Sequence, residues 1–268
     1  MASGSPMVIV AGGCFLLAAL AYVRSRRIGT WLAAAGGMIL AGALAARGLR
    51  AGYWPISSEY EFALAFALAT VVAALVPFAA VSHRISVARA ATMLIAALLV
   101  TYARFLLPGS KQSIRPLPPA LDSAWLPLHG GTAALAFGAL ALAGAAGLAW
   151  LLCERLSIKG TGSEAGEIEG LLDRAIAAGF PLLTLSMIFG MIWAEVAWGR
   201  YWGWDLKEIW TLITWLVYAL YWHVRRWPRW QGRRVAWLAA VGLASILFAF
   251  LSIGWLARTV GLESAHLF

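Results

Sequence analysis

The residues best suited to chemistry gather in one stretch of the chain, from Trp193 to His223. It contains seven tryptophans and closes on a histidine, and its charged side chains include Glu195, Asp205, Lys207 and Glu208. A tryptophan ring needs a matching surface and a partner for its N–H, and charges are costly in an apolar chain. Four aromatic residues and an acid fall within 198–205, more than membrane anchoring requires. We therefore expect the function to reside here, above all in the Trp-rich loop, 198–208.

The composition predicts that these residues are positioned by a membrane protein. Of 268 residues, 62% are hydrophobic and 12% charged, whereas a soluble domain has roughly twice that charged fraction. Several apolar runs reach about 20 residues, the length of helix that crosses a bilayer core of about 30 Å. We expect an all-α fold, a polytopic integral membrane helical bundle that forms a single membrane domain over 1–268. The net charge of +9 fits the cytoplasmic loops of such a protein, so no nucleic-acid partner is expected.

Eight transmembrane helices are predicted, at about 7–23, 31–46, 61–81, 90–107, 128–153, 175–197, 209–223 and 235–256. Lysine and arginine are more frequent in the loops after the first, third, fifth and seventh helices, and the positive-inside rule makes these loops cytoplasmic. The most polar connection, 154–174, is one of them. Both termini then lie on the non-cytoplasmic side. The Trp-rich loop lies there too, with the proline-rich loop 108–127, which cannot be a regular helix throughout.

Two of the four histidines could meet beside the Trp-rich loop. His129 opens the fifth predicted helix, and His266 lies in the C-terminal tail on the same side. Imidazole ligates haem iron axially and flat apolar rings cover a porphyrin, so this pair suits a haem. A zinc site would need a third or fourth ligand, for which Asp205 and Glu263 are candidates, but zinc would leave the tryptophans unexplained. A histidine at a helix start is also a common capping or loop residue.

The other two histidines lie elsewhere. His83 is in a cytoplasmic loop beside Arg84, where we expect a solvated side chain. His223 follows Asp205 by eighteen residues, about 27 Å of helix, so it lies near the inner end of the seventh helix. Two interpretations of His223 remain open: an interfacial side chain that reaches water, or an inner-side ligand far from the outer pair.

The segment from Trp198 to His223, WGRYWGWDLKEIWTLITWLVYALYWH, resembles the tryptophan-rich WWD signature of haem-handling proteins. It is most similar to the CcsA (ResC) family of system II cytochrome c biogenesis, whose signature reads roughly W-G-x-Y-W-x-W-D-P-K-E before an apolar helix that ends in histidine. The matching residues are Trp198, Gly199, Tyr201, Trp202, Trp204, Asp205, Lys207, Glu208, Trp215, Leu216, Tyr218 and His223. The predicted helix count extends the resemblance over most of the chain, with an assembly core at about 60–268.

The resemblance implies roles for single residues, with haem b as the bound substrate. His129, which ends a W-L-x-x-H approach at 125–129, matches the family's first outer axial ligand of the haem iron. His223 matches the membrane-embedded histidine, which in the family pairs with a histidine of a ResB/CcsB-type partner subunit to hold haem. The Trp-rich loop would form the haem platform, through Trp198, Gly199, Tyr201, Trp202, Trp204 and Asp205.

The sequence departs from the family pattern at two places. Leu206 replaces the usual proline after the signature aspartate, and leucine can begin the next helix at small cost. In the tail, the family usually has G-L-H-S-Y, whereas this chain has Glu263 at the expected histidine position. His266 stands three residues further on, nearly one turn if the tail is helical, so it could reach the same face. The second outer axial ligand is therefore assigned to His266.

The resemblance implies a haem-handling cytochrome c synthase subunit, acting in a holocytochrome c synthase (haem lyase) complex with the ResB/CcsB-type partner. Such a protein carries haem to the outer face and presents it for thioether attachment to the CxxCH segment of apocytochrome c. Cys14 and Cys153 form no CxxC pair, so a thioredoxin-like protein would supply thiol reduction indirectly. The location would be the bacterial cytoplasmic membrane, or alternatively the thylakoid membrane. A haem carrier that serves a chaperone, and a non-haem transporter or scaffold, remain as alternatives.

Overall fold

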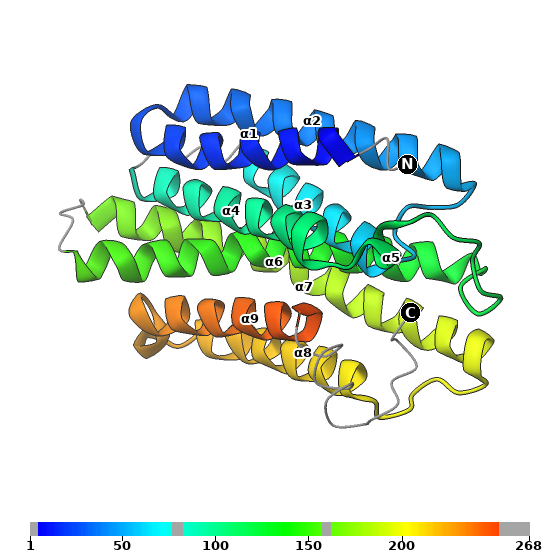
Figure 1. Ribbon diagram of the computed structural model, residues 1–268. Coiled ribbons are helices and arrows are strands. Elements are labelled where there is room, and N and C mark those ends of the chain that lie inside the picture. The colour runs from blue at the N-terminus through cyan, green and yellow to red at the C-terminus, as the bar shows by residue number, and fades with distance from the viewer. Residues whose placement is uncertain (1–4, 77–82, 157–161, 252–268) are drawn as a thin grey trace.

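The computed structural model describes residues 5–76, 83–156 and 162–251, and these are helical apart from turns and loops (Figure 1). The predicted all-α class is confirmed. The helices are α1 (Ser5–Arg24), α2 (Arg26–Ala51), α3 (Glu59–Leu75), α4 (His83–Thr101), the π-helical turn η1 (Tyr102–Leu106), α5 (Gly109–Gln112), α6 (Trp125–Arg155), α7 (Gly162–Trp198), α8 (Leu206–Arg225), the 3-10 turn η2 (Pro228–Trp230) and α9 (Arg233–Leu251).

Six stretches of helix within the described residues are long and apolar enough to cross a bilayer, so the chain is a multi-pass membrane protein. They are Pro6–Arg24, Arg26–Ala51, Ile85–Leu106, Trp125–Arg155, Gly166–Trp198 and Arg233–Leu251. Two other predicted spans correspond to α3, which has 17 residues, and to α8, which is rich in aromatic and polar side chains. The predicted count of eight is therefore supported in part.

The centre of the bundle is α6, which contacts α3, α4, α7 and α9. Its small residues let the neighbouring backbones approach closely. A Cβ on Gly138 would lie 2.4 Å from the carbonyl carbon of Ala69 on α3, and one on Gly147 would lie 2.6 Å from the carbonyl oxygen of Ala236 on α9. In Figure 1, α1 to α4 lie on one side of α6 and α7, and α8 and α9 lie on the other.

The polar connection 154–174 is structured differently from our expectation, because α7 already begins at Gly162. Ile168, Leu171 and Leu172 are buried in the main core. These apolar side chains recur at helical spacing between the charged residues, so this face packs on the bundle and continues the helix beyond its apolar part. The proline-rich loop behaves as predicted: only Gly109–Gln112 is helical before α6 begins at Trp125.

Three connections meet at one end of the bundle, called the loop end here: residues 52–58, 113–124 and 199–205 (Figure 1). Arg47 of α2 ties two of them together, because its Nε lies 2.6 Å from Oε1 of the fully buried Glu61 and its Nη1 donates to the carbonyl of Gln112. The other oxygen of Glu61 accepts from the backbone N–H groups of Ser57 and Ser58. The Trp-rich loop and the proline-rich loop both lie at this end of the bundle (Figure 1).

Candidate functional site

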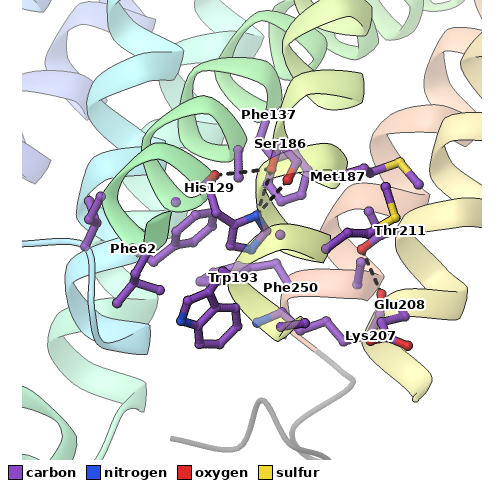
Figure 2. Close-up of a pocket in the computed structure, with 18 of the residues that line it drawn as sticks. Phe62, His129, Phe137, Ser186, Met187, Trp193, Lys207, Glu208, Thr211 and Phe250 are labelled. Atoms are coloured by element: carbon purple, nitrogen blue, oxygen red, sulfur yellow. Dashed lines mark hydrogen bonds between the residues drawn. The ribbon is translucent and has the colours of Figure 1, made fainter. Parts of the chain in front are cut away.

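A cavity of about 220 Å³ opens at the loop end, among residues of α3, α6, α7, α8 and α9 (Figure 2). Its wall is largely apolar, with Phe62, Phe137, Met187 and Phe250 among the lining side chains. His129 is the one histidine that lines it among the described residues. An apolar hollow with a few polar groups is the usual form of a small-molecule site, which makes this cavity the candidate site.

His129 is held in one orientation by α7. Its Nδ1 lies 2.9 Å from the carbonyl oxygen of Ser186, and the Ser186 hydroxyl donates to the His129 carbonyl at 3.2 Å. A carbonyl oxygen only accepts, so Nδ1 carries the proton and the basic lone pair of the ring lies on Nε2. A backbone carbonyl that fixes the tautomer in this way is the arrangement found behind histidines that ligate metals. In this tautomer, Nε2 is the ring atom that could ligate a metal ion.

Two further residues of α7 shape the position of the ring. A Cβ on Gly190 would lie 2.9 Å from both Cε1 and Nδ1 of His129, so a larger residue would displace the imidazole. Trp193 is buried and stacks on His129, with ring centroids 6.1 Å apart and planes 8° apart. Its own N–H donates to the carbonyl of Ala120 in the loop before α6. Ser186 and Gly190 were absent from the predicted site, and their spacing of four residues along α7, followed by three to Trp193, was the available signal.

The Trp-rich loop is shorter than predicted, because α7 continues to Trp198 and α8 begins at Leu206. Gly199 adopts a positive φ of 69° just after α7 ends, where glycine is favoured. Asp205 is the N-cap of α8 and forms a capping box with Glu208, which also accepts from the N–H of Gly203. The acid of the signature therefore shapes the start of α8.

The aromatic residues of the predicted platform point in different directions. Trp202 and Tyr201 both line the cavity, although Tyr201 is 59% exposed. The indole N–H of Trp202 is buried, and it has no hydrogen-bond partner in the part of the chain that the structure describes. Trp204 is 68% exposed and packs edge-on against Trp202. Trp198 contacts Trp193 behind His129, so the rings do not form one continuous plane.

One of the remaining predicted ligands, His223, does not line the cavity. His223 lies in the last turn of α8, near the opposite end of the bundle, where its ring contacts Trp227. His266 and Glu263 lie outside the described residues. Within 5–76, 83–156 and 162–251, no three His, Cys, Asp or Glu side chains gather in a way that could hold a metal ion.

Charged side chains also line the cavity, and two of them, Glu59 and Lys111, were absent from the predicted site. Glu59, in the first turn of α3, accepts hydrogen bonds from the Tyr102 hydroxyl and from Lys111. Lys207 and Glu208 of α8 line the same cavity (Figure 2). Lys111 also lines the cavity, so two lysines lie beside its aromatic wall.

Comparison with known proteins shows which family the chain belongs to. Residues 57–260 match the family model described as cytochrome c assembly protein. The chain belongs to this family. It is 35% identical to the cytochrome c biogenesis protein CcsA of Synechococcus elongatus over 88% of this chain and 86% of that protein, and 33% identical to CcsA of Microcystis aeruginosa over 85% and 84%. The CcsA resemblance of the signature is thereby confirmed.

A solved structure shares the fold. Cytochrome c Heme Lyase CcmF superposes with a TM-score of 0.67 over 97% of this chain and 49% of that chain, at 18% identity. At this identity the likeness supports the arrangement of helices, and the role of the site must be argued from its own residues.

Proposed function

We propose that this chain handles haem in cytochrome c biogenesis and presents it at the loop end for thioether attachment to the CxxCH segment of apocytochrome c. The observation that carries the proposal is the orientation of His129, whose Nδ1–H is held by the Ser186 carbonyl beside an apolar cavity. Haem is the substrate, with His129 as one axial ligand and His266 as the other. The relatives named cytochrome c biogenesis protein CcsA support a role in cytochrome c biogenesis.

The cavity fits haem in part. Its volume of about 220 Å³ is below the roughly 300–1,000 Å³ of sites that enclose a drug-sized ligand. A porphyrin would therefore enter by one face or edge and keep another edge outside, as attachment requires. Trp202 offers an apolar ring and a buried N–H at the cavity wall.

In this proposal the protein positions the reactants. Each cysteine thiol adds across a vinyl group, so that sulfur bonds to one vinyl carbon and the proton passes to the other, and no oxidant is consumed. The chain contributes by fixing the haem through His129 and by excluding water with its aromatic wall, which lowers the entropic cost of the encounter. Reduction of the thiols would be supplied by a thioredoxin-like protein.

The proposal also assigns a topology. Eight helices, α3 and α8 included, would cross the membrane with both termini and the loop end on the non-cytoplasmic side. His223 would then lie near the inner surface, where a ResB/CcsB-type partner would complete an entry site for haem. The cyanobacterial relatives make the thylakoid membrane and the cytoplasmic membrane the two candidate locations.

Co-expression with an apocytochrome c reporter tests this function. With a ResB/CcsB-type partner present, the wild-type chain should give covalent haem on the reporter, and His129→Ala should abolish it. His83→Ala, a change at the start of α4, is the matched control and should leave the yield unchanged. Haem bound to the chain without covalent product, under reducing conditions and with the partner present, would support the carrier alternative. Full product from His129→Ala would contradict the proposal.

A further inference from the structure

Lysine is rare in this chain, and its placement is uneven. Of 21 basic residues only three are lysines: Lys111, Lys159 and Lys207. Two of them, Lys111 and Lys207, line the cavity that contains His129, and none of the arginines that the structure describes lines it. The two come from different segments, α5 and the first turn of α8. The fold therefore brings two ammonium groups to one cavity whose other walls are largely apolar.

Lys111 retains hydrogen-bonding capacity despite its ion pair. Its ammonium donates to Glu59, whose other oxygen accepts from the Tyr102 hydroxyl. An ammonium has three N–H donors, and among the described residues Lys111 uses one of them, for its bond to Glu59. The Lys111 side chain is 26% exposed. Glu59 thus positions Lys111 at the cavity and leaves it donors for another anion.

Lys207 has no ion pair with any residue in the described ranges. The neighbouring acid, Glu208, is already engaged, because one of its oxygens accepts from the N–H groups of Gly203 and Asp205. Both oxygens of Glu59 and one oxygen of Glu208 are engaged by the protein, whereas the Lys207 ammonium donates to no acceptor among the described residues. A cation beside an apolar cavity gains most from a ligand that brings its own carboxylate.

Haem carries two propionate carboxylates on one half of the ring, and its two vinyl groups lie on the other half. We infer that Lys111 and Lys207 bind the propionates of the haem that His129 ligates. This inference rests on the proposed function and extends it: the two lysines would decide which edge of the ring faces the cavity margin. The vinyl-bearing half then lies on the opposite side of the iron from the lysines, which sets the edge of the ring that the cysteine thiols approach. Glu59 is a positioning residue in this arrangement.

Haem dimethyl ester, in which both propionates are esterified, tests the inference with purified full-length chain in detergent. The wild-type chain should bind haem b at least about tenfold more tightly than the ester, because a charge-assisted pair contributes roughly 1.4 kcal/mol or more. The double variant Lys111→Met/Lys207→Met should lose this difference, binding haem b as weakly as the ester while its affinity for the ester stays unchanged. Arg115→Met, at an exposed cation that follows α5 and does not line the cavity, is the matched control and should behave as wild type.

The outcomes separate this inference from the proposed function. His129→Ala should weaken both ligands; if it changes neither, the proposed site itself is wrong. If His129→Ala weakens both but the double variant weakens haem b and the ester equally, the propionate assignment is overturned and the histidine site stands. Lys111→Arg/Lys207→Arg retains both cations and should keep the preference for haem b, which provides a second test if the methionine variant does not fold. Loss of the preference in a folded arginine variant would also count against the inference.

Discussion

The two ends of α8 are attached to the bundle in different ways. At its C-terminal end, Arg225 reaches across to α7, where its guanidinium pairs with both carboxylate oxygens of Asp173 and with Glu169. The Tyr221 hydroxyl donates to the same Asp173. At its N-terminal end, α8 is stabilised by its own capping box, and the space toward α7 contains the cavity. One end is closed by ion pairs, and the other is left open between aromatic rings.

This difference teaches how stability and function are divided along one helix. The ion pairs and the Trp215 N–H, which donates to Thr184 halfway along α8, fix the helix against α7. The loop end can then contain a cavity without loss of the fold. Changes at the ion-paired end should therefore affect unfolding, and changes at the loop end should affect ligand binding.

Gly190→Ala should show the largest difference between its effect on haem affinity and its effect on stability. Its Cβ would lie 2.9 Å from the His129 ring, so the imidazole must move away from its bond to Ser186. Haem affinity should fall about 100-fold, equivalent to about 2.7 kcal/mol. The free energy of unfolding should change little, because alanine also favours the helix by up to about 1 kcal/mol. Gly131→Ala, where a Cβ meets nothing within 4 Å, is the control for haem titration and thermal unfolding.

The converse change is Arg225→Met at the ion-paired end. It leaves Asp173 and Glu169 without their shared partner, and the partly exposed cluster should lose about 2 kcal/mol of unfolding free energy. Haem affinity at the loop end should stay within a factor of about two. Arg226→Met, at the exposed neighbouring arginine, is the control. A large fall in haem affinity without loss of stability would show that the two ends do not divide these roles.

A smaller effect on haem affinity should distinguish Trp202 from Trp204 in the loop before α8. Trp202→Ala removes a ring from the cavity wall and should lower haem affinity about tenfold. Trp204→Ala removes a ring that is 68% exposed and should have little effect. Equal losses in a haem titration would indicate that Trp204 also contacts the ligand.

The smallest effect is expected at Asp205. Asp205→Ala removes the N-cap of α8 and should lower the free energy of unfolding by about 1 kcal/mol, whereas Asp205→Asn should retain most of it. Thermal unfolding of both variants measures the difference. If Asp205→Asn loses haem while keeping its stability, the carboxylate has a role beyond the cap.

Local sequence signals predicted part of this site, and tertiary packing accounts for the rest. The helical class, His129 at a helix start and the loop that carries Trp202 were accessible because each depends on neighbours in the chain. The contact of His129 with Ser186 joins residues 57 positions apart, and no local pattern reveals it. Lys111 approaches α3 and α8 only through folding of the loop between α4 and α6, so its place beside the cavity was not predictable either.

The polar connection 154–174 is another place where local sequence signals did not predict the structure. Its charges indicated a loop, but Ile168 and Leu172 are buried on the bundle, and α7 begins about three and a half turns before its predicted start. The resemblance to the CcsA family implied a place in the haem platform for the signature aspartate. In the structure its hydrogen bond to the N–H of Glu208 makes it a helix cap, a role that the spacing to Glu208 also indicates.

The central claim is that His129 ligates haem iron, and a ligand exchange tests it most directly. Purified wild-type chain and His129→Cys should be loaded with haem, and their absorption spectra compared in both oxidation states. We expect the variant to show the displaced Soret band of a thiolate ligand, because cysteine would replace imidazole on the iron. An unchanged spectrum with unchanged haem affinity would contradict the account.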